Sequence, residues 1–374
     1  MRKKVLQIGK FFPPDWGGIE TATLGNIEVF DCIEGWDLDT VIHSNHVQSK
    51  LSSTVFGYGY QSIGGIPISL DLLKSVAKNL GKYHHVIIHV PNPIPLLLVL
   101  LKKREQTFSL YWHAPVSRKG PILTLLYNIF TRVLYAKFDC IIIPTSAHIE
   151  TIPKYLHKKN FHFVDLFPTL ELKNQSTEIL ENRRVSALKA NIPYFVCAGR
   201  FVEYKGFDLA LKAFSQLKLK YHNIEIVFIG SGPEYEKYAA LTKRLGIEDS
   251  VTFLEDISNF EKLQMISGAL CLIMPSISNQ EMYGLAQIEA YACGIPVITT
   301  NLEKSGVPVI ANASGSALVV QPGSVTELAA AMEIIHTNLD LRSAMGERAR
   351  NYYLKNHDRK PIASQLQTFL RKFS

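Results

Sequence analysis

Residues 276–297 read SISNQEMYGLAQIEAYACGIPV, and they place two carboxylates, Glu281 and Glu289, eight positions apart. Gly284 lies between them, where a loop is expected to become a helix. A helix N-terminus offers unpaired N–H groups and the positive end of the helix dipole, so it attracts a phosphate. The flanking carboxylates would repel a phosphate, but they can accept hydrogen bonds from hydroxyls on either side of it. The stretch therefore predicts a site for a diphosphate with a sugar at each end, which is a nucleoside diphosphate sugar.

The composition is that of a folded protein with room for two domains: 374 residues, of which 47% are hydrophobic. The net charge of +7 favours anionic substrates or an anionic membrane surface. Nucleic acid ranks last, because no basic tract with interleaved aromatic residues occurs. The five scattered cysteines have no CxxC spacing, as expected in a reducing compartment. We expect no signal peptide and no membrane span, and hence a cytoplasmic protein, at most peripheral on the inner face of the membrane.

Two successive alternations of β-like and helical segments predict an α/β protein with two doubly wound domains. The first alternation covers 1–170, a polar connection covers 171–191, the second alternation covers 192–355, and a last helix lies in 356–374. Such sheets bind ligands at the carboxyl ends of their strands. The expected strands are 5–9, 39–43, 85–90, 108–113 and 139–144, then 194–198, 224–229, 251–253, 269–274, 296–299 and 318–320, and the expected helices of the first domain are 20–33, 70–80, 94–104 and 121–136.

Two cations follow the first strand of the second domain, in the stretch GRFVEYKG at 199–206. Arginine can bind two phosphate oxygens at once, and lysine adds a mobile point charge. Arg200 and Lys205 are therefore predicted to neutralise the diphosphate. The pair alone is more typical of a solvated loop, and it is the Glu281 and Glu289 element in the same half of the chain that favours binding.

Three looser motifs also follow predicted strands. Gly17 and Gly18 allow a backbone to approach a ligand, with a helix starting behind them, although neither a Walker loop nor GxGxxG is present. His113 can donate to a sugar hydroxyl or transfer a proton. Gly232 stands in a turn that is expected to border the nucleotide. Each signal alone fits an ordinary turn or strand end as well. The competing histidines lie in or beside β-runs without a matching partner motif: His43, His46, His85 and His89.

Taken together, these residues resemble the family 4 retaining glycosyltransferases of the GT-B type. The matching motifs occur in the family's order, namely GGIE at 17–20, His113, 199–206, GSG at 230–232, and 281–297. The resemblance implies two Rossmann-like domains facing each other across a cleft, with the C-terminal helix returning to the first domain. The chain departs from the usual pattern at 281–284, which reads EMYG rather than EGFG, and after His113, where APV replaces SD.

The resemblance also implies a role for each matched residue. Arg200 and Lys205 would hold the donor diphosphate, and Glu289 would bind the ribose hydroxyls. Glu281 would face the donor hexose near the amides of Gly284 and Leu285, and His113 would contact the transferred sugar. Gly17 and Gly18 would close on the phosphates. Gly232, in the matched GSG turn, would border the nucleotide.

The implied reaction is retaining transfer of a hexose by same-face attack, in which the leaving phosphate oxygen takes the acceptor proton. Arg200, Lys205 and the helix end would stabilise the charge that grows on the leaving diphosphate, so we expect no metal and no other cofactor. The relatives that the chain looks like suggest mannose from GDP-mannose as donor. They suggest a lipid-linked saccharide as acceptor, in the synthesis of bacterial surface polysaccharide such as O-antigen, lipopolysaccharide or exopolysaccharide.

Three basic stretches of the first domain, 102–104, 118–119 and 154–159, are expected to attract anionic lipid, with ordinary solvated faces as the equal alternative.

Two other functions stay open. A nucleotide-sugar epimerase would need no acceptor, so product analysis discriminates it. A non-catalytic nucleotide-sugar-binding partner subunit is disfavoured by the intact set of Arg200, Lys205, Glu281 and Glu289.

Overall fold

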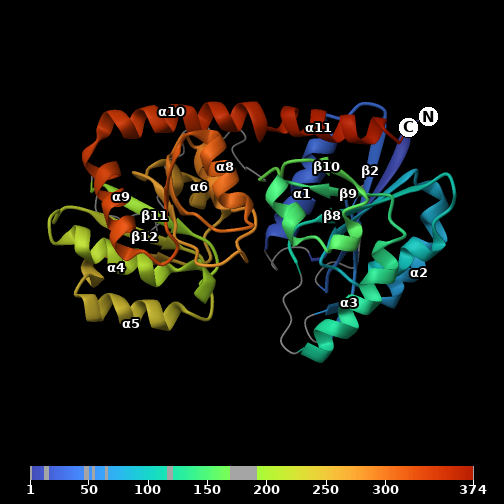
Figure 1. The fold of residues 1–374 in the computed structure, drawn as a ribbon, viewed down its shortest axis with the longest axis horizontal. Helices are drawn as coiled ribbons and strands as arrows, with labels where there is room; N and C mark the ends of the chain where they lie inside the picture. The colour runs from blue at the N-terminus through green and yellow to red at the C-terminus, as the bar shows by residue number, and fades with distance from the viewer. Residues whose placement is uncertain are drawn as a thin grey trace. The chain divides into compact units, whose positions relative to one another are not determined.

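The computed structural model describes residues 2–11, 17–45, 50–52, 55–63, 66–115, 121–168 and 192–373 (Figure 1). The chain forms two compact units, one of Met1–Thr169 with His357–Ser374 and the other of Leu170–Asn356. The connection expected at 171–191 lies outside the described residues. No described helix is both long and apolar enough to cross a bilayer.

The second unit is built on a parallel six-stranded sheet in the order β13-β12-β11-β14-β15-β16. Its strands are apolar on both faces, as in β11, which reads YFVCA, because helices cover the sheet on both sides. The chain order reverses between β11 and β14, and doubly wound sheets open their ligand crevice at this point. The strands are β11 Tyr194–Ala198, β12 Glu225–Ile229, β13 Val251–Leu254, β14 Leu272–Met274, β15 Val297–Thr300 and β16 Ala317–Val320.

Helices of the second unit pack a core rich in phenylalanine against one face of this sheet. That cluster joins α4, α5 and α9 to the strands and includes Phe195, Phe207, Phe214 and Phe228, all at most 1% exposed. The helices are α4 Phe207–Lys218, α5 Tyr235–Leu245, α6 Asn259–Ser267, α7 Leu285–Ala292, α8 Gly306–Ser314, α9 Val325–Thr337 and α10 Leu339–Asn356, with the 3-10 turns η6 Glu203–Lys205 and η7 Glu248–Ser250.

The first unit has an eight-stranded sheet in the order β10-β9-β8-β7-β1-β2-β4-β3, parallel except where β3 pairs with β4. Here the chain order reverses between β1 and β7, so the ends of β1, β7 and β8 lie side by side. The strands are β1 Lys3–Ile8, β2 Trp36–His43, β3 Lys50–Ser52, β4 Val55–Tyr58, β7 His85–Val90, β8 Thr107–Trp112, β9 Cys140–Ile143 and β10 Asn160–Phe163, and a separate hairpin joins β5 Gln61–Ile63 to β6 Ile66–Ile68.

Four α-helices and four 3-10 segments accompany this sheet among the described residues. The helix expected at 94–104 is instead a 3-10 segment, η2, in which Pro95 takes the first position. The helices are α1 Gly18–Phe30, α2 Leu70–Asn79, α3 Pro121–Tyr135 and α11 Arg359–Arg371, and the 3-10 segments are η1 Leu80–Lys82, η2 Pro95–Leu101, η3 Ser146–Thr151 and η4 Lys154–Leu156.

The last helix, α11, belongs to the first unit although it follows the second in sequence. It packs on α1, and Gln365 exchanges two hydrogen bonds with Asp165, of 2.8 and 3.1 Å. Phe369 is 2% exposed, and its ring centroid lies 5.1 Å from that of His85 and 4.9 Å from that of His162. The predicted return of the C-terminal helix to the first domain is therefore confirmed.

We expect Phe369→Ala to lower the free energy of unfolding of the first unit by about 3 to 5 kcal/mol, because it leaves a cavity under α11. Urea unfolding measures the loss. Phe163→Ala is the matched control: Phe163 is 54% exposed, so the same change should cost at most about 0.5 kcal/mol. Equal losses in the two variants would show that α11 is not anchored through Phe369.

Candidate functional site

The strand-order reversal of the second unit brings Lys205 and Glu281 into contact. Lys205 ends the turn that follows β11, and Glu281 lies in the loop that follows β14. The two strands are hydrogen-bonded neighbours, so their loops leave the same edge of the sheet side by side. Lys205 Nζ forms an ion pair with Glu281 Oε2, and the side chains are only 14% and 11% exposed. A buried ion pair thus occupies the position where ligands bind to sheets of this kind.

The lysine of this pair is held in its charged form. Burial lowers the pKa of Lys205, but Glu281 and Tyr204 together raise it by more, so the pKa lies above its usual value. Arg200 is close enough to act in the opposite direction, which places a second cation beside the pair. Arg200 itself is exposed. Two cations against one carboxylate leave this part of the site positively charged.

Serine hydroxyls fix the position of Glu281. Ser276 Oγ donates to Glu281 Oε2 at 3.3 Å, and Ser305 Oγ donates to the Glu281 carbonyl oxygen at 2.5 Å. Ser276 is the second residue after β14, whereas Ser305 precedes α8. Sequence reasoning missed both residues. The position of Ser276 after a predicted strand was an available signal, but nothing in the sequence connects Ser305 with Glu281.

Gly284 begins the helix that was predicted to receive a phosphate. It is the N-cap of α7, with a φ of 71° in the left-handed region, and no side chain caps the helix. A Cβ on Gly284 would lie 2.7 Å from Met274 Cε, at the end of a flexible side chain, so it is mainly the backbone conformation that favours glycine here. The N–H groups at the start of α7, beginning with Leu285, therefore receive no cap from the N-cap side chain.

Glu289 lies inside α7, where Lys262 of α6 is its partner. Lys262 Nζ is 2.8 Å from Glu289 Oε1, and the carboxylate side chain is 9% exposed. Sequence reasoning missed Lys262, because it belongs to a different helix. The role predicted for Glu289, binding ribose hydroxyls, stays a prediction. The ion pair occupies one of its two carboxylate oxygens.

Gly232 permits close packing of the loop after β12 on the loop after β11. Its φ is 153°, and a Cβ there would lie 2.5 Å from the carbonyl oxygen of Phe201. Phe201 N donates to the carbonyl oxygen of Ser231 at 2.8 Å, which joins the two loops. Gly232 therefore helps to shape the loop that carries Arg200.

The remaining predicted residues, His113, Gly17 and Gly18, belong to the first unit. Gly17 is the N-cap of α1 and Gly18 is its first residue. A Cβ on Gly18 would meet nothing within 4 Å, so the described residues give no steric reason for that glycine. Residues 12–16 of the same motif lie outside the described part of the chain. A closing of these glycines on phosphates stays a prediction.

His113 follows β8 and is 7% exposed. Its Nε2 lies 2.8 Å from His89 Nδ1, and its ring stacks on those of His89 and Tyr111. Its Nδ1 is buried and has no hydrogen-bond partner among the residues that the structure describes. Burial, followed by His89 and His148, holds the pKa of His113 well below its usual value, so the ring is neutral. His89, which the sequence analysis named only as a competitor without a partner motif, is a hydrogen-bond partner of His113.

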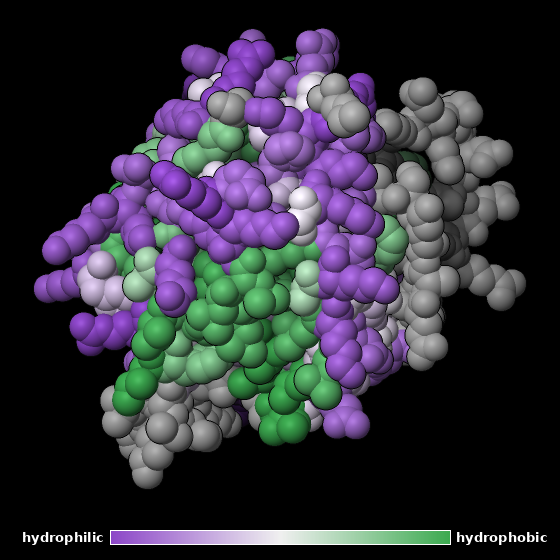
Figure 2. Space-filling model, turned by 90° about the vertical axis from the view of Figure 1, so that its right-hand side faces the viewer, coloured by the Kyte–Doolittle hydropathy of each residue, from purple (hydrophilic) through white to green (hydrophobic). Residues whose placement is uncertain are grey.

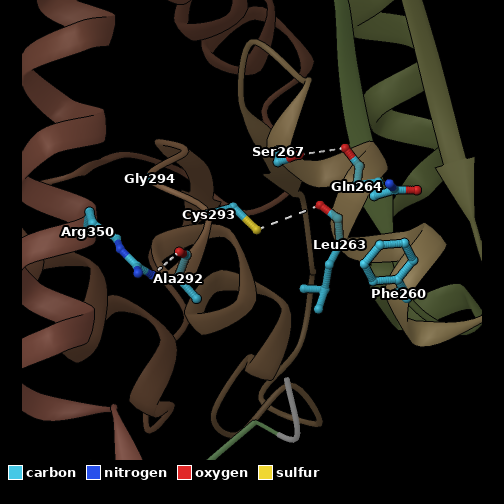
Figure 3. A pocket seen from close by; sticks show the side chains of 8 residues that line it. All are labelled: Phe260, Leu263, Gln264, Ser267, Ala292, Cys293, Gly294 and Arg350. Carbon is cyan, nitrogen blue, oxygen red and sulfur yellow. Dashed lines mark hydrogen bonds between the residues drawn. The ribbon is translucent and has the colours of Figure 1, made fainter. Parts of the chain in front are cut away.

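A cavity of about 450 Å³ lies at the other end of α7 (Figure 3). Arg350 donates to the carbonyl of Ala292 there, and Cys293 Sγ lies 3.7 Å from the carbonyl oxygen of Leu263. Cys293 is the C-cap of α7, whereas Gly284 is its N-cap. None of the predicted site residues lines this cavity, and we assign it no part in the site.

Over the described ranges, no group of three or more His, Cys, Asp or Glu side chains is arranged to hold a metal ion.

Comparisons with known proteins agree with this geometry. Residues 178–352 match the family model of the glycosyl transferases group 1. The N-acetyl-alpha-D-glucosaminyl L-malate synthase of Bacillus anthracis is 29% identical over 45% of this chain and 42% of its own length. A GDP-mannose-dependent alpha-(1-6)-phosphatidylinositol monomannoside mannosyltransferase of Mycobacterium tuberculosis is 28% identical over 48% of this chain and 47% of its own. The chain thus spans about half the length of these relatives.

Solved structures match almost the whole chain. Sucrose-phosphate synthase from Thermosynechococcus elongatus superimposes with a TM-score of 0.74 at 18% identity, covering 99% of both chains. WaaG, a glycosyltransferase involved in lipopolysaccharide biosynthesis, gives a TM-score of 0.67 at 17% identity, covering 98% of this chain and 99% of its own. These neighbours confirm the predicted GT-B fold, and the sequence matches support a glycosyltransferase.

The buried ion pair makes a testable contribution to stability. Glu281→Gln leaves Lys205 without its counter-charge, and we expect it to lower the free energy of unfolding of the second unit by about 3 kcal/mol. Lys205→Met combined with Glu281→Gln should lose less than the sum of the single losses, because the partners are coupled. Urea unfolding of Glu281→Gln, of Lys205→Met and of the double variant gives the coupling energy.

The more exposed pair between Lys212 and Asp208, 2.8 Å apart on α4 with side chains 42% and 28% exposed, provides the control. Asp208→Asn should change the free energy of unfolding by no more than about 0.5 kcal/mol. Strictly additive losses for Lys205 and Glu281 would contradict the coupling.

Proposed function

We propose that the protein is a glycosyltransferase that moves a hexose from a nucleoside diphosphate sugar to a saccharide acceptor. The observation that carries the proposal is the buried pair of Lys205 and Glu281 at the strand-order reversal, beside Arg200 and the uncapped start of α7. The cations and the helix end suit a diphosphate, and the carboxylate suits the hydroxyls of the attached sugar. The match of residues 178–352 to glycosyl transferases group 1 supports the same assignment.

The proposed reaction requires stabilisation of a leaving diphosphate whose charge grows as the glycosidic bond breaks. Arg200, Lys205 and the N–H groups at the start of α7 would act more strongly on that charge than on the ground state. With these cations in place, the proposed mechanism uses no metal.

We further propose retention of configuration by same-face attack, in which the leaving phosphate oxygen takes the acceptor proton. The alternative route to retention is attack by a carboxylate, for which Glu281 is the acidic candidate. The ion pair with Lys205 and the hydrogen bond from Ser276 both bind Glu281 Oε2. Ser276 can keep donating to this oxygen when Lys205 turns to a phosphate, and a carboxylate oxygen held by such a donor is a weaker nucleophile. This favours Glu281 as an acceptor of hydrogen bonds from sugar hydroxyls.

For the substrates, we propose mannose from GDP-mannose and a lipid-linked saccharide in bacterial surface polysaccharide synthesis. A relative in Mycobacterium tuberculosis is named a GDP-mannose-dependent mannosyltransferase, and the structural neighbour WaaG is described as acting in lipopolysaccharide biosynthesis. A further neighbour, Anabaena HepE, was solved with UDP-glucose and has a TM-score of 0.74 at 15% identity. A thermal-shift screen of GDP, UDP, dTDP and ADP sugars therefore identifies the donor first.

We expect Arg200→Ala to lower kcat/KM for that donor about 10² to 10³-fold, because it removes a cation that faces the developing charge. Initial-rate assays of glycosyl transfer, with product analysis to exclude epimerisation, measure the change. Arg244→Ala is the matched control, since Arg244 is an exposed arginine in the last turn of α5. A folded Arg200→Ala variant with near-full turnover would refute the assignment of the diphosphate site.

The first unit carries an exposed apolar surface that fits a lipid-linked acceptor. Figure 2 shows a broad apolar area on this side of the molecule, with polar residues around it. The segments α3 and η2 pack side by side. We call their exposed apolar residues, which are between 38% and 60% exposed, the α3–η2 face: Leu100, Leu101, Ile129, Phe130 and Val133. Patches of this kind mark interaction sites on soluble proteins.

We propose that the α3–η2 face enters the interface of an anionic membrane. Burial of one leucine or isoleucine side chain contributes about 2 kcal/mol, against about 1 kcal/mol for a basic residue near anionic lipid. The apolar side chains therefore dominate, and Arg132 on α3 adds charge. The predicted basic stretches 102–104 and 154–159 supply less free charge than their sequence suggests, because Lys102 pairs with Asp139 and Lys159 donates to backbone carbonyls. The stretch 118–119 lies outside the described residues.

A cavity of about 390 Å³ adjoins this face and reaches the strand end that carries His113. Trp112, Tyr127, Tyr135 and Tyr155 line it, and the guanidinium of Arg132 lies 5.2 Å from the ring centroid of Tyr155. Aromatic rings present flat apolar surfaces with polar edges, and an arginine can bind a phosphate oxygen pair. We propose this cavity for the head of the lipid-linked acceptor.

The variant with Ile129→Glu and Val133→Glu should lose most of its binding to vesicles of phosphatidylcholine and phosphatidylglycerol, because two carboxylates replace the centre of the apolar face. Flotation at low salt measures the bound fraction. Leu219→Glu is the control, since Leu219 is 81% exposed at the end of α4 in the other unit. Absence of binding by the unmodified protein at low salt would remove the membrane proposal.

A further inference from the structure

Three buried side chains form a row across the centre of the first unit's sheet. They are Gln7 on β1, His89 on β7 and His113 just after β8, and all are at most 7% exposed. The three strands are adjacent and parallel, so residues from distant parts of the chain meet near the carboxyl ends of these strands. Hydrogen bonds join the row: His113 Nε2 lies 2.8 Å from His89 Nδ1, and His89 Nε2 lies 3.0 Å from Gln7 Oε1.

The amide of Gln7 has only one orientation that satisfies its neighbours. Gln7 Nε2 lies 2.9 Å from the carbonyl oxygen of Thr23, which can only accept, and 3.2 Å from Thr40 Oγ1. Gln7 Oε1 also receives a hydrogen bond of 2.8 Å from Asn26 Nδ2. The amide nitrogen must therefore face Thr23, and the amide oxygen must face Asn26 and His89.

This orientation sets the direction of every following hydrogen bond. An amide oxygen carries no hydrogen, so His89 Nε2 must donate to it. Burial lowers the pKa of His89 to about 3, so the ring is neutral and has a single proton. That proton is on Nε2, which leaves Nδ1 as an acceptor. His113 Nε2 must then donate to His89 Nδ1, and the neutral ring of His113 has a lone pair at Nδ1.

We propose that Gln7 is a positioning residue which, through His89, holds His113 in the tautomer protonated on Nε2, so that Nδ1 accepts a hydrogen bond from a hydroxyl of the sugar substrate. The last clause rests on the proposed glycosyltransferase function. His113 Nδ1 is a buried acceptor without a partner among the described residues, and such an atom costs about 1 to 3 kcal/mol until a donor reaches it. A sugar hydroxyl can donate to it, whereas an ionised phosphate oxygen cannot.

Nitrogen NMR of the full chain labelled with ¹⁵N-histidine tests the tautomer directly. Spectra of His113→Gln and His89→Gln assign the signals. We expect both histidines to show a protonated Nε2 and an unprotonated Nδ1. A proton on Nδ1 of His113 overturns the proposal, whether or not the protein transfers sugar. Failure of the tautomer assignment is therefore distinguishable from failure of the proposed function, and this measurement needs no variant of Gln7.

Gln7→Leu removes the amide at similar volume and should release the constraint. We expect a mixture of tautomers at His113 and a fall of about tenfold in kcat/KM, with the Kd of free GDP or UDP changed less than twofold. Ser109→Ala is the matched control, because Ser109 Oγ is buried on β8 and bonds another histidine, His85, at 2.7 Å. It should leave the signals of His113 unchanged. An unchanged tautomer in folded Gln7→Leu removes the role assigned to Gln7.

Titration with UDP-glucose and with GDP-mannose, each compared with its free nucleotide, tests the hydroxyl contact. We expect the nucleotide sugar that binds to shift the His113 Nδ1 signal and the free nucleotide to leave it in place. An equal shift with the free nucleotide, or no shift at saturation with a bound nucleotide sugar, would refute the contact while leaving the tautomer result standing.

Discussion

The ion pair between Lys205 and Glu281 is the constraint on which the candidate site depends. Both charges lie largely out of water, so each side chain needs the other to remain in place. The pair joins the loops after β11 and β14 across the strand-order reversal. Ser276, in the same loop as Glu281, donates to its carboxylate, and Ser305, just before α8, donates to its carbonyl oxygen. The position of Glu281 is therefore determined by three segments of the second unit: the turn after β11, the loop after β14 and the start of α8.

In the first unit, buried polar residues also need partners, but these residues are neutral. Parallel strands bring Gln7, His89 and His113 to one edge of the sheet, where burial keeps the imidazoles uncharged. Hydrogen bonds then align them, because buried polar groups need partners. Charge compensation orders the buried polar residues of the second unit, whereas hydrogen bonds order those of the first unit.

Much of this organisation follows from local sequence. The alternation of apolar runs predicts two doubly wound sheets, and placing 199–206 and 281–289 after strands of one sheet brings Lys205 and Glu281 together. The segment 95–101 forms the 3-10 segment η2 instead of the expected helix, and Pro95 at its first position is compatible with either form. Lys262, Ser305 and the α3–η2 face could not be predicted in this way, because their contacts and exposure depend on how separate helices pack.

His89 shows most directly why the rest requires a structure. It lies inside a buried strand, and by residue type alone it is a core histidine like His85. Only the register of β1, β7 and β8 places its two nitrogens between Gln7 and His113. Sequence reasoning finds side chains that follow a strand, since they share a sheet edge. It does not find cross-strand partners within strands, since a shift of one residue would turn the side chain to the other face.

The ion pair also bears on how a donor would bind under the proposed function. Lys205 can leave Glu281 for a phosphate only if the carboxylate gains another donor, because an uncompensated buried charge is costly. A hydroxyl of the transferred hexose supplies that donor. A nucleoside diphosphate without its sugar would satisfy Lys205 and leave Glu281 facing the phosphates. Separation of the pair would therefore become favourable when diphosphate and hexose arrive as one molecule. The two residues that stabilise each other would then discriminate the intact donor from the free nucleotide.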